Sequence, residues 1–159
     1  MPWGSEVRVH LACAAALALV GASAPEVASL ETLDGDAIEV TRAPDENALV
    51  LHFWATWCPD CADELPALDR SARACEGHGV RVLMVNVGDP ADEVRRFAKG
   101  HGVELPVLLD PHGRVWRGAG LRGLPANLVW TRDGEQRSEG PSSAERWREQ
   151  LAALGCTPE

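Results

Sequence analysis

The sequence has no cluster of lysine and arginine on any single predicted element. Its 159 residues carry 15 lysine and arginine side chains against 24 aspartate and glutamate side chains, which gives a formal net charge of −9. A nucleic-acid-binding surface is expected to be basic, so nucleic acid is not expected as a partner. Internal repeats, low-complexity segments and a second domain are also missing. With 45% hydrophobic and 25% charged residues, the composition is typical of one globular domain.

The N-terminal segment differs from the rest of the chain. Arg8 is followed by the Ala/Leu-rich run HLACAAALALV at 10–20, and then by small residues. This order predicts a secretory signal peptide over 1–22, with 23–159 as one mature domain. The run is shorter than the about 20 apolar residues of a membrane span, although an uncleaved anchor starting near Val7 is an alternative that would tether the protein. A buried first helix is less favoured, because no polar stripe recurs at helical period. We therefore expect an exported protein, periplasmic or otherwise extracytoplasmic.

Export changes the interpretation of the cysteines. Cys13 belongs to the predicted signal peptide, which leaves Cys58, Cys61, Cys75 and Cys156 in the mature chain. An even number of cysteines in an oxidising compartment permits two disulfide pairs.

Turn signals and hydrophobic periodicity predict an α/β architecture. Asp34-Gly35 separates two short alternating runs within 29–41, which predicts a β-hairpin. Apolar runs predict buried strands, and apolar residues at spacings of three and four predict helices. The expected order after the hairpin is strand 48–55, helix 59–75 bent at Pro66, strand 80–87, helix 90–100, strand 105–110, a helical turn before Gly118, strand 125–130, a strand near Gln136, and helix 142–155. This order implies an α/β sandwich around a mixed sheet.

The motif CPDC at 58–61 has three interpretations. A zinc site would need Cys75 and His78 as further ligands, but the two ends of a helix over 60–75 lie about 20 Å apart, too far for one ion. A purely structural Cys58–Cys61 bridge would close so small a loop that it adds little rigidity. Both stay open as less favoured alternatives to a redox dithiol.

A redox dithiol explains the spacing best. Cysteines three residues apart on the first helical turn can form a disulfide, and the unpaired N–H groups and dipole of that helix end stabilise a thiolate. Pro59 suits the first helical position because it has no N–H. We predict that Cys58, the more exposed cysteine, attacks a disulfide as the thiolate and that Cys61 resolves the mixed disulfide.

Two stretches carry a resemblance to a known family, VLHFWATWCPDCADELPAL at 50–68 and GLPANLVW at 123–130. They resemble the thioredoxin superfamily and in particular its exported TlpA/ResA-like branch, in which a W-C-x-x-C-x-x-E-x-P helix start recurs. The likeness covers about residues 28–154. It implies a thioredoxin-like three-layer sandwich with a mixed central sheet, an N-terminal β-hairpin and an inserted helix and strand before Pro125.

The resemblance also implies an activity. It implies a thiol:disulfide oxidoreductase without cofactor or metal, which acts on protein disulfide clients of the cytochrome c maturation or metal-site assembly type. An upstream thiol donor in the membrane would supply its electrons. Reduction of client disulfides is the leading hypothesis. A disulfide-forming oxidase, or a non-enzymatic module whose dithiol binds a client or a metal such as Cu(I), are the alternatives.

The sequence departs from the family pattern at two places near the dithiol. Between the cysteines, Pro59 comes first and Asp60 second, whereas the branch often has proline second. His52 stands where thioredoxin has a buried aspartate, six residues before the first cysteine. Both departures bear on the reduction potential and on the choice of partner.

Two polar residues near the dithiol have a functional and a structural interpretation. Glu64 follows Cys61 by one helical turn and matches the acidic position of the branch, so it is a candidate to exchange a proton with Cys61. It is equally an acid favoured by the helix dipole. His52 is a candidate proton relay to Cys61, and the alternative is a hydrogen-bonded core residue.

Four residues form the predicted client-binding set: Trp57, Pro59, Leu124 and Pro125. Trp57 is expected at the contact surface beside Cys58, whereas Trp54 is expected in the core. Because only about 5% of X-Pro bonds in folded proteins are cis, the sequence alone favours trans at Pro125, but the resemblance implies cis, facing the cysteines. Leu124 would then offer its backbone to a client peptide in strand-like pairing.

The resemblance also bears on the two remaining cysteines. In a thioredoxin-like sandwich the helices over 59–75 and 142–155 pack on the same face of the sheet and run away from the active-site end. We therefore predict a disulfide between Cys75 and Cys156, which closes a loop of about 80 residues. The alternative is a buried Cys75 thiol and a Cys156 in a loose tail.

Overall fold

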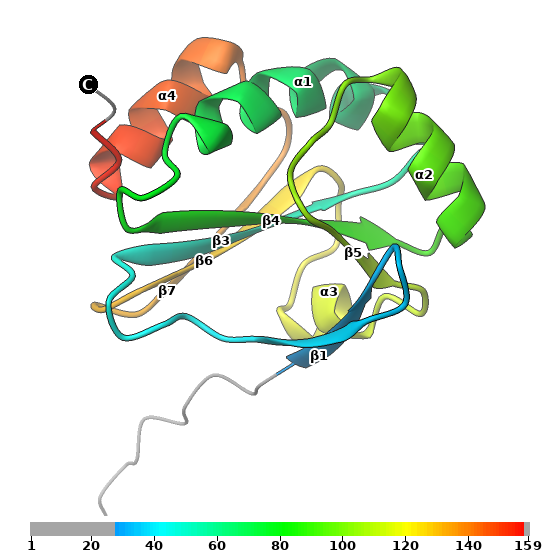
Figure 1. Cartoon of the computed structure of the whole chain (residues 1–159), viewed down its shortest axis with the longest axis horizontal. Helices are drawn as coiled ribbons and strands as arrows, with labels where there is room; N and C mark the ends of the chain where they lie inside the picture. The colour runs from blue at the N-terminus through cyan, green and yellow to red at the C-terminus, as the bar shows by residue number, and fades with distance from the viewer. Residues whose placement is uncertain (1–27, 158–159) are drawn as a thin grey trace, which may run out of the picture.

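The central sheet has seven strands. The computed structural model describes residues 28–157 (Figure 1). The strands are β1 (Ala28–Thr32), β2 (Ala37–Val40), β3 (Ala48–Trp54), β4 (Val80–Val87), β5 (Val107–Asp110), β6 (Ala126–Thr131) and β7 (Glu135–Glu139). Their order across the sheet is β2-β1-β5-β4-β3-β6-β7. Strands β3, β4 and β5 are parallel, and all other pairings are antiparallel, so the sheet is mixed as predicted.

Helices lie on both faces of this sheet. The helices are α1 (Pro59–Arg73), α2 (Ala91–Gly100), α3 (Arg114–Gly118) and α4 (Ala144–Ala153). In Figure 1, α1, α2 and α4 lie above the sheet and the short α3 lies below it. This arrangement confirms the predicted three-layer sandwich, with the β1–β2 hairpin at its N-terminal end and α2 and β5 inserted before β6.

Alternation along β3 divides the core into two parts. Leu49, Leu51 and Phe53 are fully buried on the α3 side, because successive side chains of a strand point to opposite faces. Val50 and Trp54 are buried on the side of α1 and α4. Every residue of β3 is buried, as expected for a central strand covered on both faces.

The ends of the two long helices differ slightly from the prediction. Helix α1 runs through Pro66 but ends at Arg73, so Cys75 lies in the turn that follows rather than in the helix. Helix α4 begins at Ala144, two residues later than predicted, because the Ser143 side chain accepts the N–H of Arg146 and caps it.

The predicted signal peptide at 1–22 lies outside the described residues. Within 28–157, none of the helices has the length and apolar character that crossing a membrane requires.

Candidate functional site

The dithiol lies at the start of α1. Cys58 and Cys61 form a disulfide with their Cα atoms 5.3 Å apart. Cys58 is the N-cap residue of α1, and its Sγ accepts the N–H of Cys61 at 3.3 Å. Pro59 is the first residue of the helix. The same N–H and the helix dipole favour a negative charge on the Cys58 sulfur once the bond is reduced.

Both cysteines are largely covered, but to different degrees. Cys58 is 5% exposed and Cys61 is 0% exposed. Cys58 is therefore the less buried of the two cysteines, and its role as the attacking thiol stays a prediction.

The loop before the dithiol is fixed by Asp89, which follows β4. Its carboxylate accepts the backbone N–H of Thr56 at 2.7 Å and the side-chain N–H of Asn86 at 2.8 Å. Because β3 and β4 are parallel, the segments that follow them leave the sheet at the same edge. Sequence reasoning missed Asp89 and Asn86. Their position at the carboxyl end of a predicted buried strand was the signal available.

The two tryptophans near the dithiol have opposite environments. Trp57 is 69% exposed, the one large hydrophobic side chain exposed to this degree in the described part of the chain. Trp54 is fully buried and packs against Phe97, with ring centroids 5.1 Å apart. Trp57 therefore presents an apolar surface directly next to Cys58, and Trp54 belongs to the core.

The peptide bond between Leu124 and Pro125 is cis. Strand β6 starts at the next residue, and its first residue, Ala126, pairs with Phe53 near the carboxyl end of β3. This register brings Pro125 to the edge of the sheet from which the chain continues to Cys58.

Glu64, one helical turn after Cys61 in α1, lies next to His52 of β3. Glu64 Oε1 lies 3.2 Å from His52 Nε2, and neither atom has another hydrogen-bond partner among the described residues. The other carboxylate oxygen of Glu64 accepts the backbone N–H of Ser142 at 2.5 Å. His52 Nδ1 lies 2.8 Å from Oδ1 of Asn127. The structure therefore places two predicted site residues in direct contact.

Burial shifts both groups towards their neutral forms. It raises the pKa of Glu64 to about 7; the bond from Ser142 opposes this shift, and the nearby charge of Asp60 adds to it. Burial lowers the pKa of His52 to about 4, against the opposing effect of the Asn127 hydrogen bond. Between these values a protonated carboxyl faces a neutral imidazole.

Sequence reasoning missed Asn127 and Ser142. Asn127 is a polar residue in an otherwise apolar predicted strand, which is a usable signal. Ser142 has no comparable signal, because it is 78 positions from Glu64 and meets it only through the packing of α4 on α1.

The other two cysteines are also joined. Cys75 and Cys156 form a disulfide with Cα atoms 5.3 Å apart, between the turn after α1 and the segment after α4. Both are almost completely buried, and the bond lies at the opposite end of α1 from Cys58.

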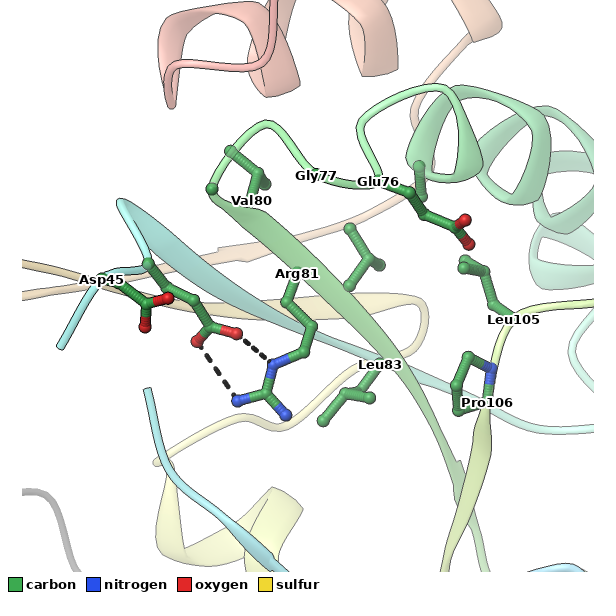
Figure 2. Close-up of a pocket in the computed structure, with 12 residues that line it drawn as sticks. Asp45, Glu76, Gly77, Val80, Arg81, Leu83, Leu105 and Pro106 are labelled. Carbon is green, nitrogen blue, oxygen red and sulfur yellow. Dashed lines mark hydrogen bonds and ion pairs between the residues drawn. The ribbon is translucent and has the colours of Figure 1, made fainter. Parts of the chain in front are cut away.

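A hollow of about 500 Å³ lies near the carboxyl end of α1 and the start of β4 (Figure 2). Its main cation, Arg81, is paired with Glu46, with Nε 2.5 Å from Oε1. None of the residues lining the hollow is a cysteine or a histidine. It is separate from the dithiol site. Within 28–157 no group of three or more His, Cys, Asp and Glu side chains is arranged to hold a metal ion.

Residues 20–137 match the AhpC/TSA family. The chain belongs to this family. It is 32% identical over 106 residues to the thiol-disulfide oxidoreductase ResA of Halalkalibacterium halodurans, a match that covers 67% of this chain and 60% of ResA. Three ResA relatives, at 31–32% identity, are matched over only 60%, 66% and 63% of their lengths.

Two solved structures at 26–27% identity have the same fold. The structure of MTB dsbF superposes with a TM-score of 0.73 at 26% identity, covering 80% of this chain and 94% of that one. StoA from Bacillus subtilis superposes with a TM-score of 0.66 at 27% identity, covering 80% and 97%. These similarities confirm the predicted resemblance to the thioredoxin-like, ResA-like proteins.

Proposed function

We propose that this protein is an exported thiol:disulfide oxidoreductase that reduces disulfide bonds in client proteins. The observation that carries the proposal is the Cys58–Cys61 disulfide at the N-terminus of α1, with the more exposed sulfur at the position where a thiolate is stabilised. The relatives named thiol-disulfide oxidoreductases support it.

The reaction proceeds through a mixed disulfide. The Cys58 thiolate attacks one sulfur of the client disulfide, a Cys58–client bond forms, and the second client sulfur leaves with the electron pair and takes up a proton. Cys61 then gives its proton to a base, for which Glu64 is the proposed residue, and attacks Cys58 Sγ. The Cys58–client bond breaks, the client sulfur leaves with the electron pair and takes up a proton from solvent, and the products are a client dithiol and the Cys58–Cys61 disulfide.

The client binds across the exposed edge beside Cys58. Trp57 supplies exposed apolar contact area, Pro59 follows Cys58 directly, and cis-Pro125 precedes β6 at the same edge of the sheet. Leu124 precedes β6, so its backbone is positioned to pair with an extended client segment. Clients of the cytochrome c maturation or metal-site assembly type, and a thiol donor in the membrane, complete the proposed pathway.

Reduction is the proposed direction. Asp60 places negative charge near Cys58, which opposes ionisation of the Cys58 thiol. A strong oxidant depends on a stabilised thiolate in its reduced form, so this charge favours a reductase. Export rests on the sequence of residues 1–22 and the paired cysteines.

An insulin-reduction assay with a dithiol donor tests the proposed activity. The wild-type protein is expected to accelerate disulfide reduction, and Cys58→Ser to have no activity. Metal analysis of protein purified under reducing conditions is the parallel measurement. Stoichiometric metal without insulin reduction would favour a binding module, and activity in Cys58→Ser would contradict the mechanism.

A further inference from the structure

His52 is a polar residue in the fully buried strand β3. Its ring is 0% exposed, and Nδ1 lies 2.8 Å from Oδ1 of Asn127. The Asn127 amide nitrogen donates to Ser138 Oγ at 3.2 Å. Because a carboxamide oxygen only accepts hydrogen bonds, the hydrogen in the contact with Asn127 must be carried by Nδ1. In the neutral ring, Nε2 is therefore left with its lone pair.

That lone pair faces a carboxyl group. Glu64 Oε1 lies 3.2 Å from Nε2, and the side chains of His52 and Glu64 are 0% and 3% exposed. Glu64 Oε2 already accepts the N–H of Ser142. Without a proton between Oε1 and Nε2, two lone pairs would face each other in a buried site, which is unfavourable. A neutral pair with one proton avoids the cost of burying two full charges.

We infer that Glu64 Oε1 and His52 Nε2 share a single proton, that Asn127 fixes the His52 tautomer this requires, and that the pair exchanges this proton with Cys61. The inference rests on the proposed thiol–disulfide exchange and identifies the proton store of that reaction. His52 acts through Glu64 and is thus a positioning residue. The raised pKa of Glu64 and the lowered pKa of His52 agree with a neutral pair.

The proton moves when the enzyme disulfide is reduced. A donor thiolate attacks Cys58 Sγ, the Cys58–Cys61 bond breaks, and the electron pair goes to Cys61 Sγ. The shared proton then moves from Glu64 Oε1 to Cys61 Sγ, which leaves a carboxylate facing the Nε2 lone pair. The proton returns to this high-affinity position when the Cys61 thiol later attacks Cys58 Sγ in the mixed disulfide.

The pair is enclosed by four elements. Helix α1 contributes Cys61 and Asp60, whose charge raises the pKa of Glu64. Strands β6 and β7 contribute the uncharged side chains of Asn127 and Ser138. Helix α4 contributes the Trp147 ring, edge-on to His52 with centroids 5.5 Å apart. Asp60 is therefore the charged neighbour whose effect on the Glu64 pKa must be separated from that of His52, and Asp60→Asn is the control variant.

The first test is the tautomer of His52 in the oxidised wild-type protein. Nitrogen-15 NMR that correlates ring nitrogens with ring protons distinguishes the two neutral forms, and the exposed His112 serves as the reference ring. The Nδ1–H form is expected at pH 5.5. An Nε2–H form would overturn the inference. This measurement needs no variant, so it decides even if substitutions at His52 prevent folding.

The second test is the pH profile of the Cys61 step. Single-turnover release of a client from the Cys58 mixed disulfide is measured against pH in the wild type, His52→Asn, Glu64→Gln, Asp60→Asn and the surface control His112→Asn. Loss of the Nε2 acceptor destabilises the protonated carboxyl, so His52→Asn is expected to lower the midpoint by about one pH unit. Glu64→Gln is expected to abolish the transition, and His112→Asn to leave it unchanged.

These outcomes separate the inference from the proposed function. An inactive wild-type protein would contradict the oxidoreductase proposal itself. An active wild type whose midpoint is the same in His52→Asn would overturn the shared proton alone. Asp60→Asn is expected to lower the midpoint less than His52→Asn, because the exposed Asp60 is screened by solvent, whereas His52 Nε2 lies 3.2 Å from the carboxyl oxygen. An equal or larger shift in Asp60→Asn would assign the effect to general charge and also overturn the inference.

Discussion

The backbone N–H of Ser142 donates to Oε2 of Glu64 across 2.5 Å, which joins the segment before α4 to the active-site helix. The bond stabilises the carboxylate form, yet burial is the stronger effect and the pKa of Glu64 is raised to about 7. The folded state therefore favours the protonated, neutral form of the Glu64 carboxyl.

Replacing Glu64 with glutamine should change how stability depends on pH. The folded pKa of about 7 lies above the usual 4.5, so the contribution of the neutral carboxyl is full below pH 4.5 and is lost as pH rises through 7. Glutamine does not ionise, so Glu64→Gln should gain about 3 kcal/mol relative to wild type between pH 4.5 and pH 8. Thermal unfolding of both proteins measures this, with the exposed Asp63→Asn as control. A difference that does not change with pH would contradict the prediction.

Replacing Cys61 with serine should trap clients. Cys58 still attacks, but the mixed disulfide is not resolved, so covalent complexes accumulate on non-reducing gels. Cys58→Ser should trap none. Equal trapping by both variants would show that Cys58 is not the sole attacking thiol.

The reduction potential should be that of a reductase. Negative charge from Asp60 near the Cys58 sulfur disfavours its thiolate, so the potential should lie closer to that of thioredoxin (about −270 mV) than to that of a strong oxidant (about −120 mV). Equilibration with glutathione or dithiothreitol measures it. Asp60→Asn should make the protein more oxidising. A wild-type value near that of the strong oxidants would reverse the proposed direction.

Removing the Cys75–Cys156 bond should affect stability and leave the chemistry intact. The cysteines are 81 positions apart, and closing a loop of this length is worth roughly 4 to 5 kcal/mol in the chain-entropy model. The double variant Cys75→Ser/Cys156→Ser should lose about this much in urea unfolding, while retaining insulin reduction under conditions where it stays folded. Loss of activity in the folded variant would mean that this bond takes part in exchange.

Asp89 should matter for the dithiol loop. Asp89→Ala removes the acceptor of the partly buried Thr56 N–H, and leaving that donor without its partner should cost about 1 kcal/mol. A less ordered loop should also slow exchange by about tenfold, which corresponds to about 1.4 kcal/mol. Asp92→Ala, an exposed position in the first turn of α2, is the matched control. Equal stability and equal exchange rates in the two variants would show that Asp89 does not order the loop before the dithiol.

Local sequence determined the strands, the helices and the dithiol. The apolar run that becomes β3 and the periodic positions of α1 predict their elements because burial on one or two faces leaves a repeating pattern. The position of Cys58 and Cys61 on a first helical turn is equally local, since it needs only Pro59 and the helix start. The exact end of α1 was wrong by two residues because end positions depend on local turn geometry rather than on periodicity.

Contacts between distant segments were decided only by the tertiary structure. The sequence alone favoured a trans bond at Pro125, because the local energy difference is small and the surrounding structure selects the isomer. The sequence identified Glu64 and His52 as separate candidates. The 3.2 Å distance between Glu64 Oε1 and His52 Nε2 arises only where α1 packs on β3. Asn127 and Ser142 joined them through strand pairing and the packing of α4. Hydrogen-bond partners far apart in sequence leave no periodic signal, so the CPDC dithiol was readable from the sequence, whereas the buried polar contacts of Glu64 and His52 were set by the fold.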